Sequence, residues 1–411
     1  MEVRLNSKSK YGILLISSVL VIYAIIGGMM GRASAQNGSY QQLSTFMEVL
    51  KHIQDDYVDD PSMKDALTGA VRGLIESVDP AGGYLTAKEV AFYKDYNAQK
   101  TPGIGAVLVR RGGYPIILSV MPGGPAAKAG LGTGDLIESI EKITTREMNI
   151  VQVNVLLSAP VGKPVNLSVI RRRKSEPETI TLNREAMIVP AIEARIMETN
   201  VAYVRIPYLA PGKALEARKL LEPLLKKNVA GVVLDLRGTA GGDDKEGIQL
   251  ANLFMDSGVI ATLQGQKFEK ETFSATAKDA ITKLPVVTLI NQGTAGAAEL
   301  VAGALGDSKR GQLIGTKTFG SASVQKLLPI DDGAGLLISV AKYHSPAGTD
   351  IQEAGIKPTM EVLPQSEELF NPDDDTEVVQ PSKAAPAEED RQLKKAIEIV
   401  KDPSKAVKKA G

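Results

Sequence analysis

The sequence predicts a multidomain α/β protein whose largest part is an α/β core with a mainly parallel sheet. Its 411 residues are too many for one typical domain of about 150. Continuous apolar runs such as 229–237 and 286–290 alternate with helical stretches, which is typical of parallel strands buried on both faces. Residues 101–185 differ, because they hold short β-type runs separated by Gly and Pro.

The composition excludes several classes of function. The 48 Lys and Arg residues balance the 48 Asp and Glu residues, so the chain lacks the positive field typical of nucleic-acid binding. It has no cysteine and two histidines, His52 and His344, and His344 is expected at a strand end rather than as a base. We therefore expect no nucleic-acid partner, no metal and no cofactor. Any enzyme chemistry would use hydroxyls, carboxylates, Lys, Arg or backbone amides.

Residues 1–35 are predicted to be a membrane anchor or a signal segment. Arg4, Lys8 and Lys10 precede an uncharged, mostly apolar run at 11–31, which is long enough to span a bilayer as one helix. The preceding positive charges favour a cytoplasmic N-terminus, so the body is expected outside the cytoplasm. The small residues 33–35 also suit signal peptidase, and cleavage after Ala35 would secrete the protein instead.

Residues 41–100 are predicted to form a small helical N-terminal domain. Phe46, Val49, Leu50 and Ile53 recur at three- and four-residue spacing. A second helical run ends at Asp79-Pro80. We expect this domain to serve packing or dimer contacts.

The module at 101–185 is predicted to contain five strands and two helices. The predicted strands are 106–109, 116–120, 136–140, 165–170 and 179–182. A short helix at 125–131 and the turn at Gly134-Asp135 complete an order that resembles a PDZ domain. This resemblance implies that an unstructured protein C-terminus adds to an open strand edge and that the amides of Gly103, Ile104 and Gly105 bind its carboxylate. Alternatively, these glycines only shape a turn.

The core at 187–363 has two notable strand-to-helix joints. The first, 234–242, is rich in glycine but lacks the lysine of a phosphate loop, so Gly241 and Gly242 are interpreted as an oxyanion-stabilising loop or as a plain tight turn. The second, 291–299, crowds small residues at the start of a helix, as a nucleophile elbow does. Thr294 is its only hydroxyl-bearing residue.

Seven segments follow one another in the order found in one peptidase family. They are 46–50, 77–80, the PDZ-like module, 235–242, 291–299, 318–325 and 351–358. Over Gln41 to Val362 the chain thus resembles the carboxy-terminal processing, or tail-specific, serine peptidases. The resemblance implies a serine nucleophile, a lysine general base and a PDZ domain that admits the substrate's C-terminal tail.

Both members of that Ser/Lys dyad are absent from the matching positions. The family's serine is followed three residues later by a glutamate, and here Gly296 stands before Glu299. The family's lysine follows Thr-Phe-Gly and precedes a glutamine by four residues, and here Ser321 stands before Gln325. The resemblance, with both dyad members missing, therefore implies a pseudopeptidase that binds C-terminal tails or partner proteins as a scaffold or adaptor.

Two other functions stay open at this point. An active endopeptidase could use a hydroxyl of Thr294, Ser321 or Ser323 with the amine of Lys317 or Lys326, provided that the pair lies within about 3 Å. The chain could also be a structural oligomer. A homo-oligomer and an active paralogue are both possible partners.

Residues 364–411 are predicted to be a linker followed by a C-terminal helix. The first part is polar and contains Asp373, Asp374 and Asp375. Residues 390–400 regain helical spacing, with acids first and lysines later. This helix could dock on the body or on a partner.

Overall fold

The computed structural model describes most of the chain and divides it into two units. The described residues are 17–18, 21, 42–97, 103–146, 148–172, 174, 176–186, 188–364 and 390–402. The units are Met1–Gly73 and Leu74–Gly411. The predicted membrane segment, apart from three of its residues, and the predicted linker at 365–389 lie outside the described residues. Within the described residues, none of the helices has the length and apolar character needed to cross a bilayer.

The described part of the first unit is helical except at residues 57–62. Residues 42–56 form a helix. Helix α2 (Met63–Val78) begins in this unit and ends in the second, directly before Asp79-Pro80. Because proline disfavours helical geometry in the residue before it, the end of α2 agrees with the helix end predicted there.

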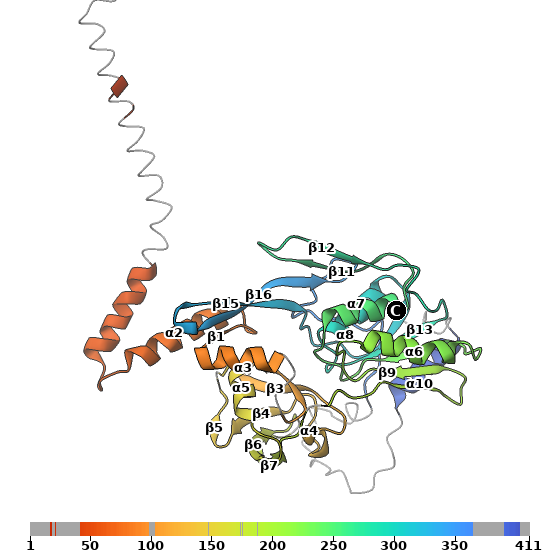
Figure 1. The fold of residues 1–411 in the computed structure, drawn as a ribbon, viewed down its shortest axis with the longest axis horizontal. Helices are drawn as coiled ribbons and strands as arrows, with labels where there is room; N and C mark the ends of the chain where they lie inside the picture. Colours follow the sequence, from red (N-terminus) through yellow and green to blue (C-terminus); the bar gives the residue numbers. More distant parts are fainter. Residues whose placement is uncertain are drawn as a thin grey trace, which may run out of the picture. The chain divides into compact units, whose positions relative to one another are not determined.

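The PDZ-like module has the predicted strands in the predicted order (Figure 1). Its sheet has the order β2-β3-β4-β6-β7, and β5 pairs with β4. The strands are β2 (Ala106–Arg111), β3 (Tyr114–Val120), β4 (Leu136–Ile140), β5 (Ile143–Thr144), β6 (Pro164–Ile170) and β7 (Pro177–Asn183). Helices α4 (Pro125–Lys128) and α5 (Ile150–Leu157) complete it, and Asn149 caps α5 by accepting from the Gln152 amide at 2.9 Å. Strand β2 is an edge strand of this sheet, so one side is open to strand addition.

The α/β core is built on a six-stranded sheet of order β17-β14-β13-β10-β9-β8. Every described pair in it is parallel except β8 with β9. The strands are β8 (Glu193–Ile196), β9 (Ala202–Arg205), β10 (Val232–Asp235), β13 (Val286–Ile290), β14 (Gly311–Gly315) and β17 (Met360–Glu361). This sheet, the PDZ-like module and the helices confirm the predicted α/β fold class.

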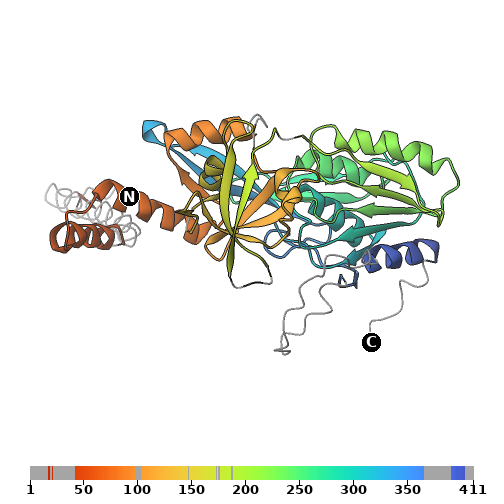
Figure 2. The ribbon, with the colours of Figure 1, turned by 90° about the horizontal axis from the view of Figure 1, so that it is seen from below.

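Helices cover both faces of this sheet. Val232 and Leu234 belong to the hydrophobic cluster that includes α6 (Lys213–Leu225), α7 (Asp244–Asn252) and α8 (Ala297–Asp307). Val233, which points to the opposite face, packs instead against the C-terminal helix α10 (Arg391–Lys401). Figure 2 shows α10 in dark blue on the opposite side of the sheet from α6. The predicted C-terminal helix therefore docks on the body of its own chain.

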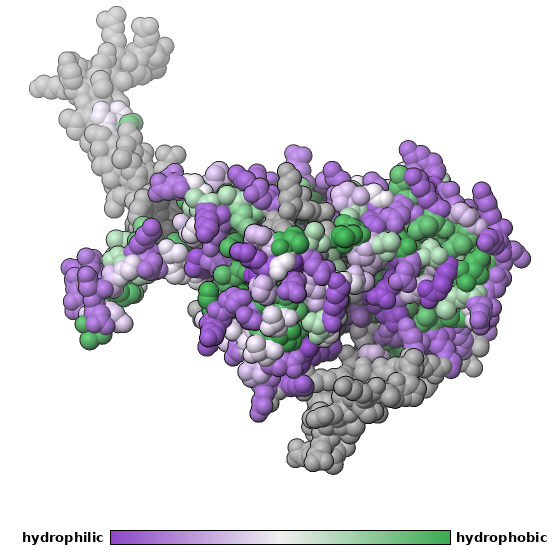
Figure 3. All heavy atoms as spheres, turned by 60° about the horizontal axis from the view of Figure 1, so that its bottom comes forward, coloured by the Kyte–Doolittle hydropathy of each residue, from purple (hydrophilic) through white to green (hydrophobic). Residues whose placement is uncertain are grey.

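A second sheet completes the core. It has the order β1-β16-β11-β12, and β15 pairs with β16. Its strands are β1 (Gly83–Leu85), β11 (Val259–Gln264), β12 (Glu271–Ser274), β15 (Ser323–Pro329) and β16 (Gly335–His344), so His344 does lie at a strand end. Helix α3 (Ala87–Asn97) and the 3₁₀ turn η1 (Asp331–Gly333) lie beside β1 and β16. Figure 3 shows mainly hydrophilic side chains on the face it displays, with small hydrophobic groups between them.

An ion pair fixes the first turn of α10. The Arg237 guanidinium donates to both carboxylate oxygens of Asp390, at 2.9 and 2.7 Å, and Asp390 also caps α10 by accepting from the Leu393 amide at 3.0 Å. Although burial disfavours the charged carboxylate, Arg237 holds the pKa of Asp390 below its ordinary value. This stabilisation is therefore present at neutral pH and is lost as the pH falls through that lowered pKa.

We expect Asp390→Asn to lower the free energy of local opening of α10 by about 1.5–3 kcal/mol. Asparagine keeps the helix cap, but the charged partner of Arg237 is lost. Hydrogen exchange of the α10 amides at neutral pH measures this local opening. Glu398→Gln is the control, because Glu398 pairs with Lys395 on the same helix at 2.9 Å, and loss of such an i,i+3 pair should change exchange little. Equal exchange in the two variants would show that the ion pair does not hold the helix.

Candidate functional site

Gly296 occupies the turn between β13 and α8. Its backbone has φ +65° and ψ −126°, the sharp geometry of a strand-to-helix elbow, and it is the N-cap of α8. A Cβ atom built on Gly296 would lie 3.6 Å from the Ser321 carbonyl oxygen and 3.7 Å from the Gly241 amide nitrogen. Both are ordinary contacts, so a small side chain fits at this position. The elbow is present, and the residue on it has no nucleophile.

The glycine-rich loop after β10 lies beside this elbow. Gly241 and Gly242 both have positive φ, and a Cβ on Gly242 would come within 2.5 Å of the Leu209 carbonyl oxygen, so the loop requires glycine there. The Asn291 side chain accepts from the amides of Gly238 and Gly293, both at 3.0 Å, and thereby joins the two predicted joints. The amide nitrogen of Gly241 therefore lies next to the side-chain position of residue 296.

Glu299 connects the elbow to the segment that contains Ser321. This fully buried carboxylate accepts from the amides of Gly296, Gly320 and Ser321 at 3.0, 2.7 and 2.8 Å. It also accepts from the Thr318 hydroxyl at 2.5 Å. Burial raises the pKa of Glu299 above its ordinary value, although these four donors favour the charged form. Glu299 thus brings the two dyad positions together without touching a reacting group.

The hydroxyl and amine groups near the site are not paired as a dyad. Thr294 is fully buried, and its hydroxyl donates to the Leu236 carbonyl at 2.8 Å. Ser323 shares a hydrogen bond of 3.1 Å with the Ser339 hydroxyl. Ser321 is half-buried, whereas Lys317 and Lys326 are exposed. Within the described residues, no group of three His, Cys, Asp or Glu side chains could hold a metal ion.

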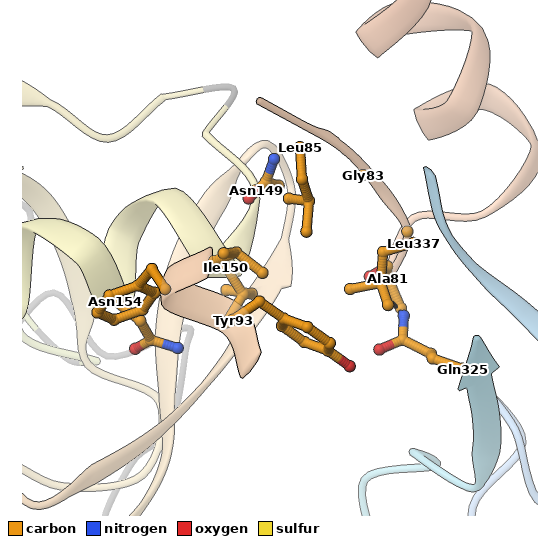
Figure 4. Close-up of a pocket in the computed structure, with 12 residues that line it drawn as sticks. Ala81, Gly83, Leu85, Tyr93, Asn149, Ile150, Asn154, Gln325 and Leu337 are labelled. Carbon is orange, nitrogen blue, oxygen red and sulfur yellow. Dashed lines mark hydrogen bonds between the residues drawn. The ribbon is translucent and has the colours of Figure 1, made fainter. Parts of the chain in front are cut away.

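Gln325 lies at the edge of a small cavity of about 200 Å³ (Figure 4). Its side-chain amide donates to the Ala81 carbonyl at 2.7 Å. The cavity is lined by residues of β1, α3, α5 and β16, and the ring of Tyr93 extends toward Gln325 in the close-up. Neither Gly296 nor Ser321 lines this cavity. It is therefore a neighbouring space and not the predicted catalytic position.

The PDZ-like module covers the two glycine-rich loops. Val107 on β2 approaches the Gly241 Cβ position to 4.0 Å, and it belongs to a cluster with Ala240, Ala295 and Phe319. The Ser119 hydroxyl donates to the Gly238 carbonyl. In this arrangement β2 and β3 lie directly over the elbow and the glycine-rich loop after β10.

The predicted carboxylate-binding loop precedes β2. The Gly103 amide donates to the Glu185 carbonyl at 3.1 Å, and the Glu185 amide donates to the Gly103 carbonyl at 3.1 Å. The carbonyls of Ile104 and Gly105 accept from Ala126 and Met121, both at 2.8 Å. The amides of Ile104 and Gly105 donate to no acceptor within the described residues. These two amides are the ones that could bind a terminal carboxylate.

Sequence reasoning did not single out Asn291, Thr318 or Ser119. A short polar residue directly after a buried strand is a typical loop-closing signal, and it could have identified Asn291. Thr318 belongs to the segment 318–325, but no sequence pattern indicates that its hydroxyl donates to Glu299. Ser119 gives no local signal, because its partner Gly238 lies 119 positions later in the chain.

Comparison with known proteins places these features in one family. The model of Peptidase family S41 matches residues 200–362, and a PDZ domain model matches residues 116–171. The carboxy-terminal processing protease CtpA of Bacillus subtilis is 30% identical over 80% of this chain and 71% of its own length. The carboxy-terminal-processing protease of Bartonella bacilliformis is 28% identical over 85% and 81% of the two chains.

A plant relative and a solved structure support the same family assignment. The chloroplastic carboxyl-terminal-processing peptidase 2 of Arabidopsis thaliana is 32% identical over 76% of this chain, and the match spans 58% of the plant protein. The structure of a photosystem II D1 C-terminal processing protease superposes with a TM-score of 0.67 and 27% identity, covering 77% of this chain and 92% of that one. The chain therefore belongs to the carboxy-terminal processing protease family, with an S41 peptidase core and a PDZ domain.

Proposed function

We propose that this chain is a catalytically inactive member of its family, which binds unstructured protein C-termini through its PDZ domain. One observation carries the proposal. Gly296 stands at the position expected for the nucleophile and has no side chain, and Ser321 stands at the position expected for the general base and has no amine. Loss of both members of a catalytic unit leaves only the residual acceleration that the oxyanion site and binding provide.

The positions of the alternative hydroxyls and amines support inactivity over a relocated dyad. Thr294 uses its hydroxyl inside the core, and its amide lies within the elbow turn. Lys317 and Lys326 are exposed, so they lack the desolvation that a lysine general base requires. An active enzyme that uses these residues is therefore the weaker candidate.

The PDZ domain supports the binding half of the proposal. Strand β2 is an open edge, and the amides of Ile104 and Gly105 are available beside it. An extended tail can pair with β2 while its carboxylate accepts from these amides. Because Val107 on β2 packs in one cluster with Ala240 and Ala295, a tail paired with β2 would lie near the elbow.

We also propose that the protein is tethered to the cell membrane with its body outside the cytoplasm. The apolar run at 11–31 and the basic residues before it support this orientation. An unstructured tail outside the cytoplasm, or an active relative that shares the same substrates, is the expected partner. A scaffold of this kind would hold tails for such a relative without cutting them.

Tail binding without cleavage is the expected result when the full chain in detergent micelles meets a labelled unstructured peptide with an apolar C-terminus. Fluorescence anisotropy should show saturable binding, and amidation of the peptide's C-terminus should weaken it about tenfold or more, because charge-assisted hydrogen bonds are lost. Mass spectrometry should find the free peptide intact.

Three results would change the proposal. Cleavage that Ser321→Ala or Thr294→Ala abolishes would establish an active peptidase with relocated residues. Equal binding of the free and amidated peptides would exclude carboxylate capture by the loop at Gly103–Gly105. Neither binding nor cleavage would favour the purely structural oligomer.

A further inference from the structure

A groove of about 820 Å³ lies on the second sheet, between the β15–β16 hairpin and the turn that joins β11 to β12. Four lysines line it, and none of its lining residues is an aspartate or a glutamate. Two of the lysines belong to the strands and two to the turn. They are Lys326 on β15, Lys342 on β16, and Lys267 and Lys270 in the turn. We call this surface the lysine groove.

The floor of the lysine groove is apolar. Leu337 and Tyr343 on β16 are buried, so the side chains that alternate with them along the strand point to the opposite face. On that face Ile338 and Val340 line the groove and are only half-buried. The half-buried side chains of Leu328 and Phe268 complete the floor. Apolar surface of this kind is stabilised when a partner covers it.

Three of the four lysines have no acidic partner. Lys267, Lys270 and Lys326 are exposed and form no ion pair within the described residues. Lys342 contacts Asp350 at 3.3 Å, but both side chains are exposed, and such a pair contributes little. The lysine groove is therefore locally positive, although the formal net charge of the whole chain is zero.

We propose that the lysine groove binds an acidic segment of a partner protein, in which apolar residues stand between aspartates and glutamates. The carboxylates of this segment pair with the lysines, and its apolar side chains cover the floor. A hollow with an apolar floor fits a single chain better than it fits the flat plane of lipid headgroups at a membrane surface.

The lysine groove is separate from the other sites. Gln325 precedes Lys326 on β15, but its side chain donates to the Ala81 carbonyl and lines the small cavity on the other face. Neither Gly296, Ser321 nor the loop at 103–105 lines the groove. The proposal therefore depends neither on tail binding by the PDZ domain nor on the loss of catalysis.

Fluorescence anisotropy on the full chain in detergent micelles tests the groove. The probe is a labelled peptide in which Glu alternates with Leu, and its C-terminus is amidated so that it offers no terminal carboxylate to the PDZ domain. We expect saturable binding in a low-salt buffer, weakened about fivefold or more in the double variant Lys267→Gln, Lys326→Gln. The matched control Lys226→Gln, Lys227→Gln removes two exposed lysines directly after α6 and should leave the affinity unchanged.

Two further measurements test the floor and locate the bound peptide. Replacing Leu by Ser in the peptide should weaken binding about tenfold or more, because the apolar contacts are lost. Bound peptide should also protect Lys267, Lys270 and Lys326 from acetylation by an amine-reactive ester, which mass spectrometry measures.

Three outcomes would overturn the proposal. The peptide could fail to bind, or the two double variants could bind it equally well. Finally, short-chain phosphatidylglycerol could protect the groove lysines from acetylation while the peptide does not, and the groove would then face a lipid surface instead.

Discussion

Restoring the two missing side chains should turn this chain into a working endopeptidase. We expect the double variant Gly296→Ser, Ser321→Lys to cleave an unstructured tail at least about 10²-fold faster than the unaltered chain, because a positioned general base alone contributes 10²–10⁴-fold. The elbow at Gly296 already has the required backbone geometry, and the Cβ position lies 3.7 Å from the Gly241 amide. Serine there would therefore lie beside the Gly241 amide, which we expect to stabilise the oxyanion that forms on the attacked substrate carbonyl.

The neighbourhood of residue 321 favours the same outcome. The Ser321 carbonyl lies 3.6 Å from the Cβ position of residue 296, and Glu299 fixes the Ser321 amide. A lysine at 321 would thus begin next to the new serine and half-buried, which partly desolvates its amine. Serine at a positive φ costs about 1–3 kcal/mol of stability, and the structure must absorb that strain.

Mass spectrometry of the incubated peptide measures the gain in cleavage rate. The single variants Gly296→Ser and Ser321→Lys should each remain inactive. Gly296→Ala, Ser321→Lys is the matched control, because it adds the same Cβ and the same amine but no hydroxyl. A folded double variant that binds the tail and does not cut it would show that the site has lost more than its dyad. In that case, the packing of β2 and β3 over the site is the next feature to test, because Val107 lies over Gly241.

The fold was predictable because its signals are local. Buried parallel strands are continuous apolar runs, so β10 and β13 were found within a few residues of their observed ends. The glycine loops were found for a similar reason, because the close approach at Gly242 leaves no room for a side chain. Gly296 and Ser321 could be assigned to the dyad positions because fixed spacings to Glu299 and Gln325 mark them.

Contacts between distant segments were not predictable. Nothing near Ser119 or Val107 indicates that they lie on the catalytic loops, since the complementary surface comes from residues after 237. The amphipathic pattern of α10 predicted an apolar face but left open which surface covers it. The ion pair of Asp390 with Arg237 joins positions 153 apart and decides that question.

Removing Glu299 should destabilise the protein more than any other single change at the site. Glu299→Ala leaves four buried donors without their acceptor, namely the amides of Gly296, Gly320 and Ser321 and the Thr318 hydroxyl. Each unsatisfied group costs about 1–3 kcal/mol, and water should satisfy some of the four. We therefore expect the free energy of unfolding to fall by about 3 kcal/mol or more. Urea titrations measure this change in the free energy of unfolding. The control Glu222→Ala removes an exposed glutamate from α6 and should lower the free energy of unfolding by less than about 0.5 kcal/mol.

The pH dependence tests whether the Glu299 carboxylate itself sets this stability. Burial raises its pKa in the folded state, so the folded chain binds the proton more readily than the unfolded chain does. This contribution to stability is fully present below the ordinary glutamate pKa and is lost as the pH rises through the raised value. The stability of the unaltered chain relative to Glu299→Gln should therefore increase as the pH falls from 7 toward the ordinary glutamate pKa. A difference that stays constant or shrinks on acidification would mean that the four donors outweigh burial and hold Glu299 charged.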